Sequence, residues 1–252
     1  MITLVGSGNV ATWIAQRLQG NLRFPITQVY SRKKENAQML AELLNAEAIA
    51  DIRKLNTDNQ IFVFALADNA YADILPQLPF TLPASFMTSG TVSCRCLAEH
   101  SDAYGVIYPL QTFTKSQEMS DLKVPLCLES DFAGDRKTLM WELARQLSPN
   151  CYEVSEVQRA RLHLAAVFAS NFSNAMYHVA YKLLEEKDLP FEMLIPLLYQ
   201  TVRKLETLTP AESQTGPAAR RDMNVMRKQL ESLEDPKWKE LYQRISELIM
   251  EF

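Results

Sequence analysis

The chain has 252 residues, of which 47% are hydrophobic, and this length predicts one large or two modest domains. The hydrophobic content excludes a disordered chain. The 30 acidic and 26 basic residues give a formal net charge of −4. No basic stripe or tail is present, so we expect no nucleic-acid partner.

The sequence offers no signal for a membrane or a metal. Its apolar runs are shorter than the roughly 20 residues that a membrane span needs. The segment Met1–Val5 lacks the basic start of a signal peptide, so we expect a cytoplasmic protein. Cys94 and Cys96 are separated by one residue, unlike the wider spacing of zinc sites, and no His–Cys cluster completes a ligand set. We therefore expect no metal.

Short apolar runs alternate with amphipathic stretches over residues 1–152. The runs predict strands at Ile2–Val5, Ile26–Tyr30, Ile61–Ala67, Ser85–Thr88, Tyr104–Tyr108 and Val124–Glu129. Between them, Val10–Leu18 and Lys34–Leu44 carry apolar residues three and four positions apart, which predicts helices. This alternation predicts an α/β domain with a Rossmann-like, mostly parallel sheet that helices cover on both faces.

The pattern becomes helical from residue 153, which predicts a second, all-α domain over residues 153–252. Ser155 and Gln158 form a capping-box pattern that opens a long helix, predicted to reach Glu186. Further helices are predicted at Phe191–Leu208, at Pro217–Leu233 and from Pro236 to the end. Pro217 and Pro236 suit a first helical turn, whereas Pro196 predicts a kink or an earlier helix start.

A glycine-rich turn joins the first predicted strand to the first predicted helix. It has the pattern G-x-G-x-x-A over Gly6, Ser7, Gly8, Asn9, Val10 and Ala11. Gly6 permits the tight turn, Gly8 lets the backbone approach a pyrophosphate, and Ala11 allows close helix–strand packing. The start of the helix presents free N–H groups to phosphates. Residues 6–10 are therefore candidate cofactor-binding residues, and an ordinary tight turn is the alternative.

The end of the second predicted strand favours NADP over NAD. NAD-selective sites place an acidic residue there to bind the ribose 2′-hydroxyl. This chain instead has Ser31, Arg32 and Lys33, which suit a 2′-phosphate. The alternative is that Ser31 caps the next helix while the two basic side chains are only solvated.

Two further loops lie where the cofactor of such a domain would continue. Leu66 and Ala67 follow the third predicted strand, on the adenine and pyrophosphate side. Ser89 and Gly90 follow the fourth, where the nicotinamide is expected. Taken alone, either segment also fits an ordinary turn.

Two sets of motifs together resemble a known bacterial family. The first set contains residues 6–11, Val-Tyr-Ser-Arg (29–32), Thr-Ser-Gly (88–90) and Pro-Leu-Gln-Thr-Phe (109–113). The second contains Ala-Ala-Val-Phe-Ala-Ser-Asn-Phe-Ser-Asn (165–174) and Gln-Thr-Gly-Pro-Ala-Ala-Arg-Arg-Asp (214–222). The family joins an NADP-binding Rossmann-like domain to a helical domain of unknown function, number 2520. It is deazaflavin-dependent NADP oxidoreductase-like and similar in plan to pyrroline-5-carboxylate reductase. The resemblance implies this fold, NADP and a homodimer through the helical domain.

Two departures concern the proton donor. The family often has histidine before Pro-Leu-Gln-Thr-Phe, whereas this chain has Tyr108. Related hydroxyacid dehydrogenases have a catalytic lysine one turn before an asparagine equivalent to Asn171, whereas this chain has Val167. The candidate donors are therefore Tyr108, Ser89 and His178. Gln111 and Thr112 are candidate substrate-binding residues.

The long helix and a later loop supply the other candidates. Asn171, Asn174 and His178 are spaced to share one helix face, as a polar cleft wall or as a buried polar seam at a helix contact. In the segment 214–222, Gln214, Arg220 and Arg221 are candidates for binding a carboxylate of the substrate, because arginines and free N–H groups at a helix start bind anions. Solvated arginines at a plain helix start are the alternative.

The leading hypothesis is an NADP(H)-dependent oxidoreductase that reduces a small carbonyl or imine, with a carboxylate among the candidate substrate groups. Two alternatives stay open. One is a non-catalytic NADP-binding sensor or regulatory dimer, and the other is hydride exchange between NADPH and a deazaflavin, which needs no protein acid.

Overall fold

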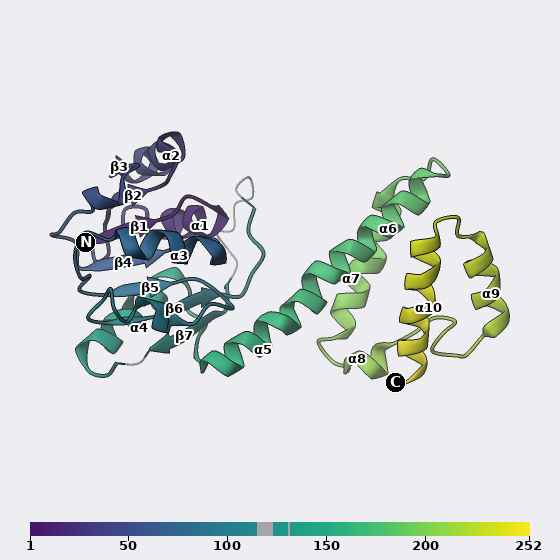
Figure 1. Ribbon diagram of the computed structural model, residues 1–252. Coiled ribbons are helices and arrows are strands. Elements are labelled where there is room, and N and C mark those ends of the chain that lie inside the picture. Colours follow the sequence, from purple (N-terminus) through teal and green to yellow (C-terminus); the bar gives the residue numbers. More distant parts are fainter. Residues whose placement is uncertain (115–122, 131) are drawn as a thin grey trace. The chain divides into compact units, whose positions relative to one another are not determined.

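The computed structural model describes residues 1–114, 123–130 and 132–252. In this described part, residues up to Glu153 form an eight-stranded sheet with the order β3-β2-β1-β4-β5-β6-β7-β8 (Figure 1). Strand pairs are parallel except β6 with β7. The predicted mostly parallel α/β sheet is confirmed. The chain builds outward from β1 to β3 on one side and from β4 on the other, so the order reverses between β1 and β4. Ligands of doubly wound sheets bind at such a reversal.

The strands of the sheet are β1 (Ile2–Val5), β2 (Ile26–Tyr30), β3 (Glu47–Ile49), β4 (Ile61–Phe64), β5 (Ser85–Met87), β6 (Tyr104–Pro109), β7 (Leu126–Ser130) and β8 (Cys151–Glu153). All six predicted strands are present, with ends that differ by up to three residues. β4 ends at Phe64 because residues 65–67 leave the sheet as a loop. β3 and β8 were not predicted, because three residues are too few to show a pattern.

Helices cover both faces of the sheet. One apolar cluster joins alternate strand residues such as Leu4 and Val63 to α1 (Asn9–Leu18), α2 (Lys34–Leu44) and α4 (Asp135–Leu147). The other cluster joins residues such as Val5 and Phe64 to α3 (Tyr71–Ile74) and the short 3₁₀ helices around it. Because alternate residues of a strand point to opposite faces, both faces of β1 and β4 are buried.

The predicted long helix starts where expected. Ser155 accepts a hydrogen bond from the backbone N–H of Gln158, whose side chain accepts one from the backbone N–H of Ser155. α5 (Glu156–Ala166) follows, then a π-helix (η5, Val167–Phe172) and α6 (Ser173–Glu185). The helix is therefore not α-helical throughout, and the wider π turn offsets Asn171 from the face that Asn174 and His178 share. π segments are frequent at functional sites.

The remaining helices correct two predictions. The predicted helix from Phe191 is divided into a 3₁₀ turn (Phe191–Leu194) and α7 (Ile195–Lys204), which places Pro196 in a first turn, where its missing N–H is tolerated. The helix predicted from Pro217 begins only at Met223 (α9, Met223–Ser232). Its cap is Asp222, whose carboxylate accepts from the N–H of Val225. α8 (Pro210–Ser213) and α10 (Pro236–Met250) complete the chain.

The chain forms two compact units, Met1–Ser170 and Asn171–Phe252, named below the sheet unit and the helical unit. The sheet ends at Glu153, near the predicted domain boundary at residue 152, while the units divide inside η5. The assignment of 1–152 and 153–252 as domains stays a prediction. Within the residues that the structure describes, no helix is both long and apolar enough to cross a membrane.

Candidate functional site

Only glycine is tolerated at position 6. Gly6 has a φ of 127°, and a Cβ at this position would lie 2.2 Å from the carbonyl oxygen of Ala65, in the loop after β4. A side chain would therefore be strained and would also collide with backbone. Gly6 thus lets the loop after β1 lie directly against the loop after β4, at the reversal of strand order.

Gly8 leaves open space at the start of α1. A Cβ at Gly8 would meet nothing within 4 Å, and Gly8 caps α1 without a side-chain hydrogen bond. The first turn of α1 contains no acidic residue. Free backbone N–H groups and the positive end of a ten-residue helix suit a phosphate group. The side chain of the next residue, Asn9, donates to the carbonyl oxygen of Phe113 at 2.6 Å.

A cleft of about 330 Å³ extends from the glycine turn toward the end of β2. Its lining includes eight of the predicted cofactor residues, namely Gly6, Ser7, Gly8, Ser31, Arg32, Lys33, Leu66 and Ala67. The hydroxyls of Ser7 and Ser31 lie 2.8 Å apart. Lys33 is the N-cap of α2 and makes no side-chain cap bond, so Ser31 does not cap this helix. Arg32 and Lys33 are exposed beside the cleft, which is the arrangement expected of a 2′-phosphate site.

Asp68 joins the loop after β4 to the loop after β5. Ser89 Oγ donates to Asp68 Oδ1 at 2.7 Å, and the hydroxyl of Thr91 bonds to Asp68 Oδ2. Ser89 Oγ also accepts the backbone N–H groups of Thr91 (3.1 Å) and Val92 (2.9 Å). Because the hydroxyl of Ser89 is held in three hydrogen bonds, it is better placed to shape this loop than to donate a proton to a substrate.

Tyr108 and His163 form a pair beside the same loop. The hydroxyl of Tyr108, near the end of β6, lies 2.9 Å from Nδ1 of His163 on α5. A Cβ on Gly90 would lie 2.5 Å from that nitrogen and 2.9 Å from the Tyr108 ring, so only glycine fits between them. Burial is the main cause that raises the pKa of Tyr108 to about 12, and Arg159 acts in the opposite direction. Tyr108 therefore keeps its proton at neutral pH, with a half-buried imidazole in direct contact.

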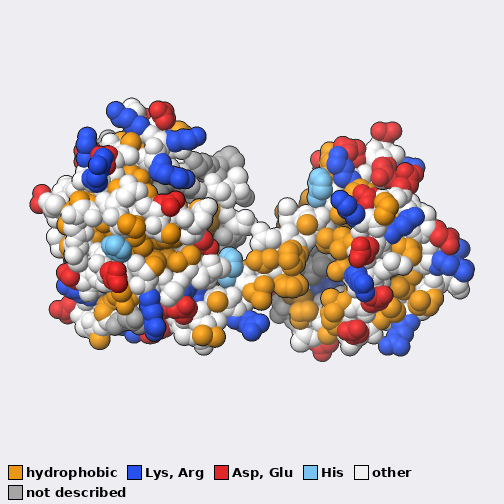
Figure 2. Space-filling view, viewed as in Figure 1, with side chains coloured by type: hydrophobic (Ala, Val, Ile, Leu, Met, Phe, Trp, Pro, Cys, Tyr) orange, Lys and Arg blue, Asp and Glu red, His pale blue; other side chains and the backbone are white. Residues whose placement is uncertain are grey.

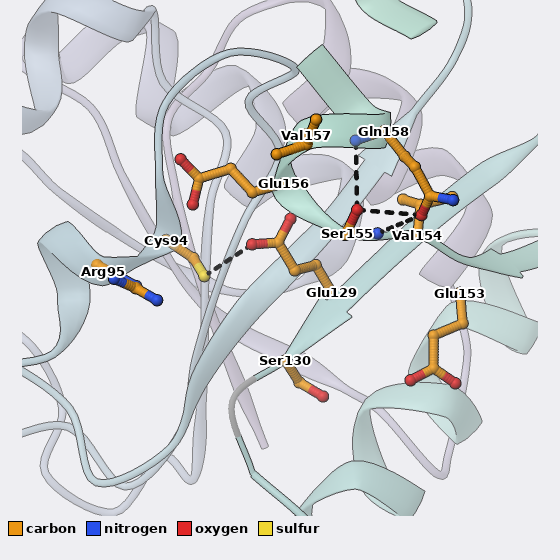
Figure 3. Close-up of a pocket in the computed structure, with 10 residues that line it drawn as sticks. All are labelled: Cys94, Arg95, Glu129, Ser130, Glu153, Val154, Ser155, Glu156, Val157 and Gln158. Carbon is orange, nitrogen blue, oxygen red and sulfur yellow. Dashed lines mark hydrogen bonds between the residues drawn. The ribbon is translucent and has the colours of Figure 1, made fainter. Parts of the chain in front are cut away.

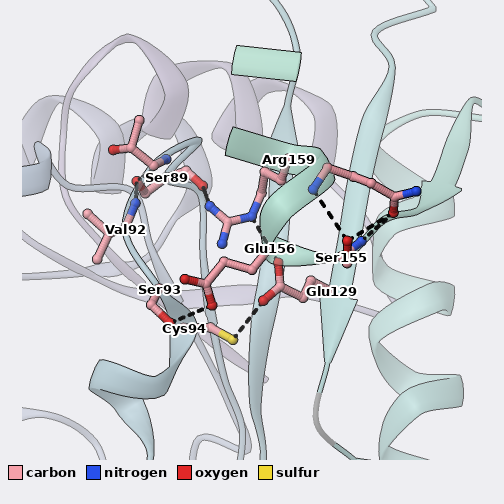
Figure 4. Close-up of polar contacts among 10 residues, drawn as sticks. Ser89, Val92, Ser93, Cys94, Glu129, Ser155, Glu156 and Arg159 are labelled. Carbon is pink, nitrogen blue, oxygen red and sulfur yellow. Dashed lines mark hydrogen bonds and ion pairs between the residues drawn. The ribbon is translucent and has the colours of Figure 1, made fainter. Parts of the chain in front are cut away.

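A buried arginine lies one helical turn before His163. Arg159 is 0% exposed. Nη1 donates to the carbonyl oxygen of Ser89 at 3.0 Å, and Nε donates to Glu129 Oε2 on β7 at 3.0 Å (Figure 4). The other oxygen of Glu129 accepts from the thiol of Cys94 at 3.4 Å. The loop after β5 is thus bonded to α5 as well as to Asp68.

A second cavity, of about 590 Å³, lies at the start of α5 (Figure 3). Its lining includes the carboxylates of Glu129, Glu153 and Glu156 and one arginine, Arg95. A predominantly acidic lining repels phosphates, so this cavity does not suit a dinucleotide. The cleft at the glycine turn is the better candidate.

Several residues of the candidate site were missed by sequence reasoning. His163, Asp68, Glu129 and Arg159 were not selected as site residues. The pair Tyr108 and His163 is separated by 55 residues, and no motif connects them. The available signal is that Arg159 and His163 are four residues apart and so share a helix face with the half-buried Leu162.

The remaining predicted site residues lie in the segment after β6 and in the helical unit. Gln111 and Thr112 follow β6 and are exposed, and Gln111 Oε1 accepts the N–H of Thr112. The others belong to the helical unit: Asn171, Asn174, His178, Gln214, Arg220 and Arg221. Asn171, Asn174 and His178 are exposed, and the His178 ring stacks on Tyr181. Their part in a substrate site stays a prediction.

The predicted anion site at 214–222 loses its main physical support. Residues 217–221 form turns, not a first helical turn, and Arg221 has a φ of 53° and donates to the carbonyl oxygen of Met250 at 3.1 Å. Arg220 is exposed. The helix start is already capped by a carboxylate, that of Asp222. The expectation of free N–H groups beside Arg220 is therefore wrong.

The sheet order, the glycine turn and the cleft define a Rossmann-type protein with a helical unit after the sheet. Residues 124–249 match the family described as Domain of unknown function (DUF2520). The chain is 36% identical to a "putative NADP oxidoreductase", BF3122 from Bacteroides fragilis, with a TM-score of 0.91 over 100% of this chain and 98% of that chain. The chain belongs to the DUF2520 family.

More distant structures share the fold. Protein TM1727 from Thermotoga maritima has 23% identity and a TM-score of 0.72, covering 100% of this chain and 98% of that one. A 1-pyrroline-5-carboxylate reductase from Streptococcus pyogenes has 14% identity and a TM-score of 0.65, also covering 100% and 98%. The predicted resemblance in plan to that enzyme is confirmed. A comparison with curated proteins found no match.

Proposed function

We propose that this protein is an NADPH-dependent reductase of a small carbonyl or imine compound. The observation that carries the proposal is the hydrogen-bonded pair of Tyr108 and His163 beside the Ser89–Gly90 loop, in the same sheet unit as the glycine-turn cleft. Structures that share the fold include the Bacteroides protein described as an NADP oxidoreductase and a reductase of an imine, pyrroline-5-carboxylate.

The cleft has the chemistry that NADP requires. The N–H groups at the start of α1 would hold the pyrophosphate, where Gly8 leaves room for it. The hydroxyls of Ser7 and Ser31, with Arg32 and Lys33, would hold the 2′-phosphate. When bound, NADPH supplies a hydride. Reduction of a carbonyl or imine then requires one proton at the oxygen or nitrogen, and the chain must provide it.

Tyr108 is the proposed proton donor. Its raised pKa keeps the phenol protonated, but it also makes the phenolate unfavourable. His163 Nδ1 touches the phenol oxygen, so a proton on this nitrogen can pass to Tyr108 as Tyr108 gives its own proton away. The half-buried imidazole can then exchange protons with solvent.

The test is NADPH oxidation with panels of carbonyl and imine compounds, before and after the change Tyr108→Phe. Loss of a positioned general acid lowers kcat by about 10²- to 10⁴-fold. NADPH affinity should change less than about twofold, because the hydroxyl is assigned to the substrate. Tyr71→Phe is the matched control, since Tyr71 is also buried but its hydroxyl donates to the backbone carbonyl oxygen of Phe64.

Two outcomes would replace this proposal. Tight NADPH binding without turnover on any compound would favour a sensor. Turnover with a deazaflavin that is equally fast in wild type and Tyr108→Phe would favour hydride exchange, because hydride transfer to a deazaflavin needs no protein acid. Equal kcat for a carbonyl or imine in both proteins would exclude Tyr108 as the donor.

The proposed reductase is a homodimer that forms through the helical unit. Ile195, Tyr199 and Val202 share one face of α7, and their exposures are 36%, 75% and 60%. Apolar side chains are spread over the visible face of this unit (Figure 2). Exposed apolar surface of this kind is typical of a contact with another protein surface.

A further inference from the structure

Arg159 is an unusual residue to bury completely. It is 0% exposed and is the largest of the fully buried side chains in the described part of the chain. Transfer of a guanidinium out of water is unfavourable unless its donors are paired, and a buried ion pair is often no more stabilising than an apolar pair of similar volume. Fold stability alone therefore gives a weak reason for an arginine at this position.

Pairing of the guanidinium is also incomplete. Nε and Nη1 have partners, whereas Nη2 is buried and has no hydrogen-bond acceptor among the described residues. An unpaired buried donor lowers stability. The two hydrogen bonds that Arg159 does make hold three elements together. They connect α5 to β7 through Glu129 and to the loop after β5 through the carbonyl oxygen of Ser89.

We propose that Arg159 is a positioning residue, which holds the Ser89–Gly90 loop against α5 so that the loop expected to contact the nicotinamide is preformed. This inference rests on the proposed function for the identity of the ligand. The loop is held from two sides. Asp68 binds the side-chain hydroxyls of Ser89 and Thr91, and Arg159 binds the backbone carbonyl of Ser89.

The spacing along α5 connects this loop to the proton donor. Arg159 and His163 are one turn apart and therefore lie on the same helix face. Arg159 binds the carbonyl of Ser89, and His163 lies against Gly90, the next residue, and bonds to Tyr108. A loop released from Arg159 can move away from both His163 and the nicotinamide. The adenine half of the cleft, at Ser7, Ser31 and Arg32, shares no hydrogen bond with Arg159 among the described residues.

The experiment compares two ligands in Arg159→Met, Arg159→Lys and wild type. NADPH would reach both the cleft and the Ser89–Gly90 loop, whereas 2′,5′-ADP carries only the adenine half with its 2′-phosphate. Arg159→Met should weaken NADPH about tenfold and leave the affinity for 2′,5′-ADP within twofold. Arg159→Lys keeps the charge and one donor nitrogen, so it should recover part of the lost NADPH affinity. Arg161→Met, an exposed arginine on the same helix, is the matched control and should change neither affinity.

Hydrogen exchange of the ligand-free protein provides the second readout. The N–H groups of Thr91 and Val92 bond to Ser89 Oγ, so they should exchange faster in Arg159→Met if the loop is released. If Arg159→Met does not fold, the same affinities and exchange rates are measured on Arg159→Lys and Glu129→Gln, for which a smaller loss of NADPH affinity is expected. The inference would be overturned if Arg159→Met lost affinity equally for NADPH and 2′,5′-ADP. It would also be overturned if neither the NADPH affinity nor the exchange of the Thr91 and Val92 N–H groups changed. Wild-type protein that binds neither ligand would overturn the proposed function, while the exchange result would still decide the role of Arg159 in the loop.

Discussion

The sheet unit buries its central strands almost completely, whereas the helical unit leaves many of its large apolar side chains exposed. β1 and β4 consist entirely of buried residues. In the helical unit, every residue of which is described, only Ala218, Met226, Leu233 and Ser246 are buried. Because helices cover both faces of the sheet, the apolar side chains of this unit are buried within a single chain. Short helices without such a core need a further surface to cover them.

This contrast predicts that the stability of the two units depends on different factors. Stability of the sheet unit should follow changes in its own packing. Stability of the helical unit should follow protein concentration, because a subunit that is covered by its partner is stabilised by mass action. The predictions below test these two expectations in order of decreasing effect.

The largest effect is expected at Gly6. Gly6→Ala forces a side chain into a φ of 127° and places its Cβ 2.2 Å from the carbonyl oxygen of Ala65. Strain and overpacking together should lower the free energy of unfolding by about 3 kcal/mol or more. Thermal unfolding of the sheet unit measures this change, and NADPH binding should be lost with it.

Gly8→Ala is the matched variant, because a Cβ at Gly8 has open space around it. Its melting temperature should stay close to that of wild type, while NADPH affinity falls about tenfold because the new methyl group occupies the approach of the pyrophosphate. A Gly6→Ala protein that melts like wild type would refute the close packing of the two loops.

A change on α7 tests the other unit. Tyr199→Asp combined with Val202→Asp introduces two charges on the exposed apolar face. If this face is the dimer contact, desolvation of the carboxylates should weaken the dimer by about two orders of magnitude or more. Sedimentation velocity at micromolar concentration measures the result. Met39→Asp is the control on the sheet unit, where Met39 is 67% exposed on α2 and should leave the dimer intact. A wild-type monomer would contradict the proposal.

The sequence predicted the parts of the fold that depend on local pattern. The glycine turn, α2 and the capping box of α5 were predicted at the residues where they occur, because each depends on neighbours within a few positions. Failures occurred where long-range packing or a competing local signal decides. The short strands β3 and β8 exist through pairing with β2 and β7. α9 begins at Met223, not at Pro217, because Asp222 caps the helix after Arg221 adopts a left-handed conformation.

The residues of the candidate site also divide into those that local pattern predicted and those that depend on long-range packing. Residues 6–8 and 31–33 were predicted because strand ends and glycine spacing place them by known geometry, and they line one cleft. Tyr108 was selected because it stands where the family that the sequence resembles often has histidine. Its partner His163 could not be derived, because the contact depends on how α5 packs on the sheet. Arg159 was missed because a charged residue on an amphipathic helix is expected at the surface.

Alkaline pH tests the burial of Tyr108. Its pKa in the folded protein, about 12, lies above the ordinary value of about 10 for tyrosine. The folded state therefore holds this proton more tightly than the unfolded state. Its contribution is present below about pH 10 and is lost as the pH rises toward 12, so wild type should lose about 2 kcal/mol more than Tyr108→Phe across this range. Denaturant unfolding of both proteins measures the difference. Equal losses would show that the phenol is not buried.

The smallest expected effect concerns the 2′-phosphate. Arg32→Ala should lower the ratio of NADPH to NADH affinity about tenfold, because only NADPH carries the phosphate that is assigned to Arg32. Because Arg32 is exposed, solvent screening keeps the change in the affinity ratio small for a charged contact. Lys33 beside it retains part of the attraction for the phosphate. Titration calorimetry with both dinucleotides gives the ratio. Arg53→Ala, an exposed arginine paired with Asp51 elsewhere in the sheet unit, should leave it unchanged.

This measurement also returns to the contrast between the two units. All residues assigned to the 2′-phosphate belong to the sheet unit. The α7 double variant should therefore dissociate the dimer and keep the wild-type preference for NADPH. If dissociation also removes that preference, the cofactor site depends on the partner subunit, and the sheet unit is not self-sufficient. If wild type binds NADPH and NADH equally, the assignment of Ser31, Arg32 and Lys33 to a 2′-phosphate is wrong.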